Sequence, residues 1–156
     1  MISLKAILVP TDFSDTSSQA LRYGKALAEQ FKASLHLLHV IEESAFAYTW
    51  SSPEGALVVP DVREEIENGA RRQLQNTLTD EEQNKYHATL VTTMGAPFLE
   101  IVRYAQKESI DLIVMGTHGR GPIAHMLMGS VAEKVVRKAP CPVLTVRLAE
   151  HEFVMP

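Results

Sequence analysis

The sequence predicts a doubly wound α/β domain, a single parallel sheet of five strands with helices on both faces. Five short apolar runs rich in branched residues alternate with segments that have the spacing of amphipathic helices. The runs are continuously apolar, which is typical of strands buried on both faces. Strands that alternate with helices are joined by right-handed crossovers, and these produce a parallel sheet.

The first 41 residues predict two strands separated by one helix. Residues 4–9 form an apolar run that ends at Pro10, and residues 34–41 form the second run. Between them, residues 14–18 are dense in N-cap residue types, and the apolar residues that follow have helical spacing. Residues 42–60 lack a clean period and are predicted to form a long loop.

The middle of the chain predicts two helices and two strands. One helix starts at Asp61, where Glu64 completes a capping-box pattern, and continues to about Asn84. Strands follow at residues 86–94 and 111–115. Pro97 is well placed in the first turn of the helix between them.

The last helix and strand follow a glycine-rich turn. The helix begins near Gly129 and Ser130, with three valines facing inward: Val131, Val135 and Val136. Prolines at 140 and 142 end it, and residues 143–146 form the fifth strand. We expect one domain over residues 1–148 and a short tail over residues 149–156.

The composition excludes several classes of protein. The chain has 156 residues, 46% hydrophobic and 22% charged, and a formal net charge of -4. This charge gives no reason to expect nucleic acid as a partner. No apolar run approaches the roughly 18 residues that a membrane span needs. There is no secretory pattern at the N-terminus, and a single cysteine cannot form an internal disulfide, so we expect a cytoplasmic protein.

The glycine-rich turn after the fourth strand is the clearest functional pattern. It has the form Gly116-x2-Gly119-x9-Gly129-Ser130, which is neither a Walker A loop nor a dinucleotide fingerprint. Glycines let backbone amides approach phosphate oxygens, and a helix N-terminus attracts anions. The pattern therefore suits a di- or triphosphate. The structural alternative is that the glycines serve only the turn and that Ser130 is only an N-cap.

The remaining candidate residues have simpler interpretations. In parallel sheets, ligands bind beyond the carboxyl ends of the strands, where Asp12 is the one carboxylate firmly placed. We find no general base beside the phosphates, so the pattern supports binding more than efficient catalysis. His36 and His39 point to opposite faces of a strand and are expected to be packed or hydrogen-bonded. Cys141 is expected to be a small, partly buried residue.

These residues resemble the universal stress protein family over nearly the whole chain. The resemblance begins with the segment Pro10-Thr11-Asp12-Phe13-Ser14, is sharpest from residue 111 to residue 131, and closes with residues 140–144. It implies a sheet order of 3-2-1-4-5. It also implies nucleotide binding, because the chain keeps both halves of the G-x2-G-x9-G-(S/T) motif of the family's nucleotide-binding members.

The resemblance implies roles for individual residues. Val40 would contact adenine and Asp12 the nucleoside, with Pro10 and Thr11 shaping that wall. Two residues would line the ribose side: Met115 and Gly116. Four would hold the phosphates: Gly119, Gly129, Ser130 and Val131. Two further residues lie inside the motif where the family varies: His118 and Arg120. Arg120 either pairs with a phosphate or is a solvated loop charge.

The expected ligand is ATP, with AMP or ADP as alternatives, and Mg²⁺ could bridge the phosphates. The expected function is that of a stress-response sensor or regulator acting through nucleotide occupancy. A slow ATPase or phosphotransferase using the same pocket is the alternative, and a pure interaction module with a relict motif is a third.

The fifth strand predicts a homodimer. In the order 3-2-1-4-5, residues 143–148 lie at the edge of the sheet, and an apolar edge strand invites pairing with another chain. The tail after it is too short to cover it well. A two-fold partner could pair the same strand antiparallel to itself, as the family resemblance also implies. Alternatively, Arg147 and the tail shield a monomer.

Overall fold

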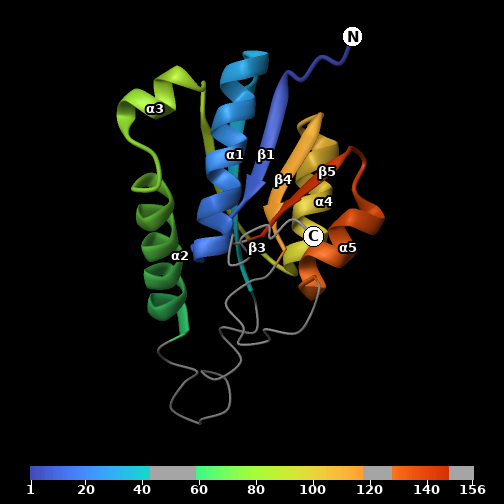
Figure 1. Ribbon diagram of the computed structural model, residues 1–156. Helices are drawn as coiled ribbons and strands as arrows, with labels where there is room; N and C mark the ends of the chain where they lie inside the picture. The colour runs from blue at the N-terminus through green and yellow to red at the C-terminus, as the bar shows by residue number, and fades with distance from the viewer. Residues whose placement is uncertain (43–58, 118–127, 148–156) are drawn as a thin grey trace, which may run out of the picture.

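The computed structural model describes residues 1–42, 59–117 and 128–147. Its elements follow in the order β1 (Ala6–Pro10), α1 (Asp15–Phe31), β2 (Ser34–Ile41), α2 (Val59–Gln75), α3 (Asp80–Lys85), β3 (Thr89–Met94), α4 (Pro97–Lys107), β4 (Leu112–Gly116), α5 (Ser130–Lys138) and β5 (Val143–Val146). The strands form one parallel sheet in the order β3-β2-β1-β4-β5, so both the predicted fold class and the predicted order are confirmed (Figure 1).

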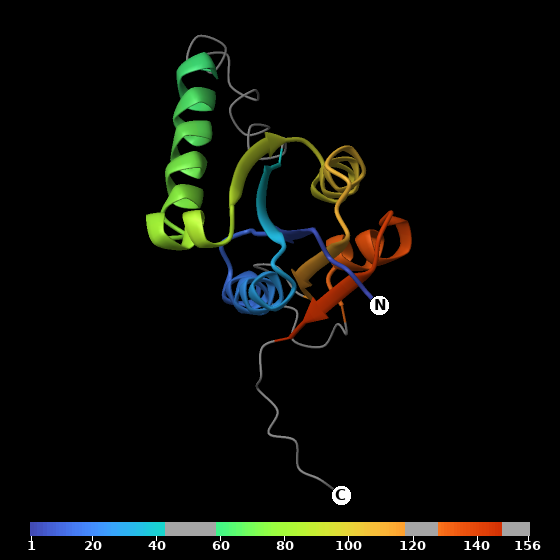
Figure 2. The same cartoon turned by 90° about the horizontal axis from the view of Figure 1, so that it is seen from above.

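The helices divide into two layers, one on each face of the sheet. Figure 2 shows α1 and α2 on one face, and α4 and α5 on the other. Alternate residues of the central strand β1 feed two cores: Ile7 and Val9 pack under α1 and α2, whereas Leu8 packs under α4 and α5. Successive residues at the end of β1 therefore face opposite sides of the sheet.

Helix α1 packs unusually close to the centre of the sheet. Its N-cap is Ser14, whose hydroxyl accepts a hydrogen bond from the Ser17 amide at 3.2 Å. Near its middle, a Cβ on Gly24 would lie 2.5 Å from Cγ2 of Val9, so this helix–strand contact requires a residue without a side chain. The close contact holds the middle of α1 against Val9 near the end of β1.

The predicted helix from Asp61 to Asn84 is wrong in two respects. Helix α2 already begins at Val59, so Asp61 lies inside it, and the chain breaks after Gln75 into a separate helix α3. The break has a local cause, because Thr79 is an N-cap that forms a reciprocal capping box with Glu82. The capping box thus stands 18 residues beyond the predicted position (79 against 61).

Smaller differences also have physical causes. Tyr86 caps the C-terminus of α3, so β3 begins at Thr89 and not at residue 86. In α5, Val135 is fully buried and Val131 is half-buried, as predicted, but Val136 is 45% exposed. Residues four apart share a helix face, whereas the next residue is turned about 100° away from it.

Some predictions fall outside the described residues. They concern the loop interior at 43–58 and the tail at 149–156 together with Leu148. Within the described ranges, no helix combines the length and the apolar character needed to cross a membrane.

Candidate functional site

The turn between β1 and α1 is held by the side chain and backbone of Thr11. Its amide donates to the Leu38 carbonyl at 2.9 Å, which continues the pairing of β1 with β2 by one residue. Its hydroxyl Oγ1 accepts a bond from the Phe13 amide at 3.0 Å and lies 3.1 Å from Oγ of Ser17. Phe13 has a φ of 63°, a left-handed conformation that bulky residues rarely adopt. The Thr11 contacts therefore hold a strained turn.

His39 supports the same turn from β2. Its Nδ1 lies 2.8 Å from the Thr11 carbonyl oxygen, and since a carbonyl only accepts, Nδ1–H is the donor. The ring also stacks on Phe13, with 4.4 Å between ring centroids. The prediction that His39 is packed and hydrogen-bonded is confirmed, and the residue positions the turn.

His36 lies on the opposite face, as predicted, and belongs to a different cluster. Its Nδ1 is 2.8 Å from the Tyr104 hydroxyl on α4. Burial lowers the pKa of His36, with a smaller opposing effect from Glu108. Burial, with the charge of Glu108 adding to it, raises the pKa of Tyr104 to about 12. Among the described residues, no group of His, Cys, Asp and Glu is arranged to hold a metal ion.

Asp12 stands at the carboxyl end of β1 with its carboxylate directed by the turn. The side chain is half-buried, and Oδ1 accepts a hydrogen bond from the Ser14 amide at 3.0 Å. This Asx-type contact fixes the carboxylate beside the first turn of α1. Oδ2 has no hydrogen-bond partner among the described residues, so the group keeps acceptor capacity at this edge.

The other strand ends meet Asp12 at the same edge of the sheet. β1 lies between β2 and β4 and is parallel to both, and the arrowheads of β1 and β4 point the same way in Figure 1. Val40, near the end of β2, is half-buried and packs against the core under α4 and α5, and Met115 belongs to that same core. Pro10, Val40 and Met115 are thus gathered at this edge, near the end of that core.

Gly116 ends β4 where α1 comes close. A Cβ at this position would lie 2.7 Å from Cγ2 and 3.1 Å from the backbone carbon of Thr16. Its lack of a side chain is therefore required by packing against the first turn of α1. Thr16 and the β1–α1 turn were not predicted to touch the glycine motif, because this contact depends on how far the helix is from the sheet.

The start of α5 is attached directly to the end of β4. The backbone of buried Thr117 donates to the Val146 carbonyl at 2.9 Å, and its own carbonyl accepts a hydrogen bond from the Gly129 amide. Gly129 is the N-cap of α5, and no side chain caps it. Ser130 is the first helical residue and is exposed. The alternative that Ser130 serves only as an N-cap is therefore wrong.

The structure accordingly brings the described part of the predicted site to one edge. The segment after β1, the ends of β2 and β4, and the start of α5 converge there, and Val131 follows Ser130 in the first turn of that helix. His118, Gly119 and Arg120 lie outside the described residues. The sequence reasoning missed Thr117, although its position directly after Gly116 in the motif could have singled it out.

Comparisons with known proteins agree on one family. The model of the universal stress protein family matches residues 3–147. Universal stress protein MJ0531 of Methanocaldococcus jannaschii is 34% identical, over 95% of this chain and 85% of its own length. Universal stress protein YxiE of Bacillus subtilis is also 34% identical, over 90% and 97%. The solved structure of protein MJ0577 of M. jannaschii superposes with a TM-score of 0.76 at 30% identity, over 96% of this chain and 100% of that one. The chain belongs to the universal stress protein family.

Proposed function

We propose that this protein binds an adenine nucleotide, with ATP as the principal ligand, at the edge formed by β1, β4 and the start of α5. We further propose that it acts in the cytoplasm as a stress-response sensor or regulator through the occupancy of that site. The observation that carries the proposal is the attachment of Gly129 to Thr117, which holds a helix N-terminus at the carboxyl end of the central strands.

The start of α5 supplies what a phosphate requires. The Glu133 amide donates the first intrahelical bond, to Gly129 at 3.0 Å, so the amides of Ser130, Val131 and Ala132 precede the bonded part of the helix. Gly129 has no Cβ to keep an anion away, and the exposed Ser130 hydroxyl can donate a further bond. Gly119, His118 and Arg120 complete the proposed phosphate contacts.

The nucleoside end of the proposed site is formed by the ends of the neighbouring strands. The carboxylate of Asp12 can accept bonds from ribose hydroxyls or from adenine, and Val40 offers an apolar side chain and a backbone edge. Pro10 and Thr11 form the adjacent wall. Met115, which belongs to the core under α4 and α5, and Gly116, which ends β4, are on the proposed ribose side.

Adenine nucleotides occur in other proteins of this fold. Universal stress proteins have been solved in complex with cAMP, at 23% identity and a TM-score of 0.59, and with dAMP, at 20% and 0.56. These similarities establish the shared fold, and residue-level support comes from this chain's own motif. Mg²⁺, if bound, would be held through the phosphates with Asp12 nearby, because hard cations of this kind keep several waters.

Nucleotide retained through purification is the first test. Ultraviolet absorbance and mass spectrometry of the released small molecules should identify an adenine nucleotide, and they separate this proposal from that of a relict motif. Single-turnover assays with Mg²⁺ separate the sensor from the slow ATPase, which would show a stoichiometric burst of ADP followed by steady turnover.

Gly129→Val tests the phosphate contacts. Gly129 has φ −68° and ψ 154°, which valine also adopts, so the fold should survive while the added side chain blocks phosphate approach. Gly69→Val is the matched control, since a Cβ there meets nothing within 4 Å. Calorimetric titration should show ATP binding lost in the first variant and kept in the second, with circular dichroism reporting the fold. Unchanged ATP affinity in Gly129→Val would contradict the phosphate assignment.

We also propose a homodimer through the edge strand β5, which pairs on one side with β4. The carbonyl of Pro142 accepts a bond from Ile113 of β4 at 3.0 Å, and that of Val146 accepts one from Thr117, directly after β4, at 2.9 Å. The backbone groups of Leu144 therefore also point toward β4, and those of Thr145 point outward. Thr145→Pro should therefore produce a folded monomer, whereas Leu144→Pro should weaken the sheet itself. Light scattering decides between these outcomes, and a parent protein that is monomeric at high micromolar concentration would refute the dimer.

A further inference from the structure

We propose a second ligand site, in a groove between α1 and the C-terminal part of α2, for a small organic anion that carries one charged group on an apolar body. The groove has a volume of about 510 Å³. This volume lies within the range of roughly 300–1,000 Å³ typical of small-molecule pockets. Its lining combines two cations with amide side chains and an apolar end.

The groove lies beside the proposed nucleotide site, and Thr11 borders both. It is lined by Phe13 and Leu21, both of which pack with the core under α1 and α2. Val40 of β2, Met115 of β4 and Val131 of α5 instead pack in the core under α4 and α5. The β1–α1 turn therefore forms the wall between the two sites.

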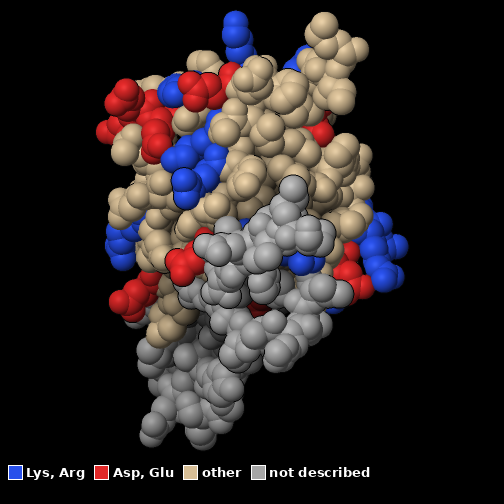
Figure 3. Space-filling model, viewed as in Figure 1, with Lys and Arg blue, Asp and Glu red and all other residues tan. Residues whose placement is uncertain are grey.

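Two cations on successive turns of α1 provide the anion-binding part of the groove. Arg22 is exposed and has no carboxylate partner among the described residues, its guanidinium making one hydrogen bond, to Gln19 at 3.3 Å. Lys25 is three residues further along the same helix face and is half-buried. Figure 3 shows basic side chains gathered over α1 on this face. A phosphate or carboxylate between Arg22 and Lys25 would receive charge-assisted hydrogen bonds.

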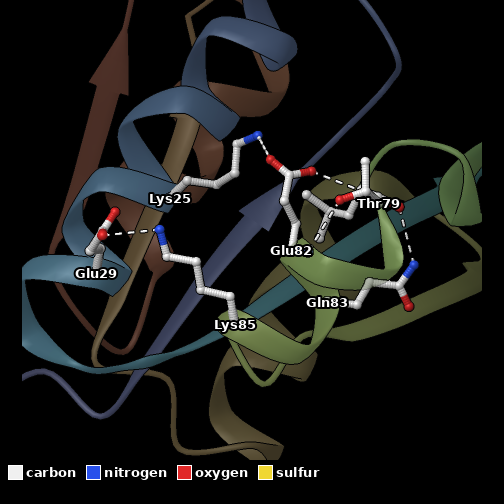
Figure 4. Close-up of polar contacts among 7 residues, drawn as sticks. Lys25, Glu29, Thr79, Glu82, Gln83 and Lys85 are labelled. Atoms are coloured by element: carbon white, nitrogen blue, oxygen red, sulfur yellow. Dashed lines mark hydrogen bonds and ion pairs between the residues drawn. The ribbon is translucent and has the colours of Figure 1, made fainter.

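The second cation is held in place by α3. Nζ of Lys25 lies 2.7 Å from Oε1 of Glu82, whose other oxygen accepts the Thr79 amide at 3.1 Å in the capping box (Figure 4). A neighbouring pair, Lys85 with Glu29 at 3.0 Å, joins the same two helices. An ammonium has three donors, so Lys25 can bind a ligand oxygen without releasing Glu82.

The other lining residues define the body of the ligand. Gln73 and Asn76 of the α2 end present amide groups, which donate and accept hydrogen bonds. Phe13 and Leu21 offer a ring and an aliphatic side chain for apolar contact. A molecule of this class therefore has an aromatic or aliphatic body and one oxyanion.

The surroundings disfavour a larger polyanion. The first turn of α3 carries Asp80, Glu81 and Glu82, and Figure 3 shows acidic side chains over α3 next to the basic group. A nucleic acid or a long polyphosphate laid across the groove would meet these carboxylates, and the repulsion between like charges opposes its binding. The charge pattern favours a single anionic group.

Phenyl phosphate is a suitable probe of this site. Heteronuclear NMR of the full chain should show saturable shifts at Arg22 and at the side-chain amides of Gln73 and Asn76. Inorganic phosphate and phenol, titrated separately, should each bind more weakly, because each lacks one half of the recognised structure. Saturating ATP should leave the phenyl phosphate shifts in place.

Substitution of Arg22 gives the decisive comparison. Arg22→Gln, at an exposed position that leaves the fold intact, should weaken phenyl phosphate binding about tenfold. Lys138→Gln, an exposed charge at the end of α5 on the other face, should leave it unchanged. The proposal is overturned by unchanged affinity in Arg22→Gln, by displacement of the probe with ATP, by shifts at α5 in place of the groove, or by no saturable shift.

Discussion

Replacing Gly116 with alanine tests whether α1 and β4 are as close as the structure indicates. The new Cβ would lie 2.7 Å from Cγ2 and 3.1 Å from the backbone carbon of Thr16, a residue that is only 6% exposed. Rotation of the Thr16 side chain cannot relieve the contact with its backbone, so the helix must move. Overpacking of this kind costs about 1–3 kcal/mol. The lower chain entropy of alanine in the unfolded state offsets up to about 1 kcal/mol of this.

The expected net loss for Gly116→Ala is up to about 2.5 kcal/mol, which for a chain of this size lowers the Tm by up to about 10 °C. Gly69→Ala is the matched control, because that glycine lies within α2 and its Cβ would meet nothing within 4 Å. It should stabilise the protein by about 0.5–1 kcal/mol through helix propensity. Urea and thermal denaturation of both variants measure the difference. If Gly116→Ala were as stable as Gly69→Ala, the close packing of α1 on β4 would be refuted.

Three further substitutions test separate parts of the molecule. Asp12→Ala should weaken ATP and adenosine binding alike in calorimetric titrations, and a loss confined to ATP with Mg²⁺ would contradict the nucleoside role. Thr79→Ala should lower the free energy of unfolding by about 1 kcal/mol, while Thr79→Ser should retain it, because only the serine keeps the N-cap acceptor; equal losses in urea denaturation would exclude the capping role. Burial lowers the pKa of His36, so the stability associated with its neutral form is present above pH 6.5 and is lost as the pH falls through the lowered pKa. In His36→Gln, the midpoint of urea unfolding should therefore decrease less steeply as the pH falls below 6.5. An equally steep decrease in the variant would show that other groups cause the loss of stability.

Most of the secondary structure could be predicted because its causes are local. Residues 34–41 were predicted as a strand and form β2, and Pro97 begins α4 as its position in the first turn indicates. The break between α2 and α3 was missed because helical apolar spacing continues across it through Leu74 and Leu78, both buried. The Thr79 capping box was visible in the sequence and outweighs that periodicity.

The site could be predicted only in outline. Its residues follow strand ends, and the topology of parallel sheets brings such positions together whatever the details of packing. Three features depend on the distance between helices and sheet, which no local pattern encodes: the strained φ of Phe13, the contact of Gly116 with Thr16, and the groove beside Arg22. The glycine contact and the groove each join α1 to a segment distant in the sequence. The Phe13 turn is held by tertiary contacts, among them the one with His39.

The segment after β1 is shared by the two proposed sites, and residue alternation explains how. Asp12 lies at the carboxyl edge, while Phe13 packs with the α1–α2 core and lines the groove. Thr11, directly before them, holds this segment, since its carbonyl accepts a hydrogen bond from His39 and its hydroxyl accepts one from the Phe13 amide. A ligand that moves Phe13 therefore acts on the backbone that carries Asp12, and any energetic coupling between the two sites would act equally in both directions. The peptide bond between Asp12 and Phe13 is the shortest physical route for such coupling, and the hydrogen bonds of Thr11 to Phe13 and His39 hold that segment in place.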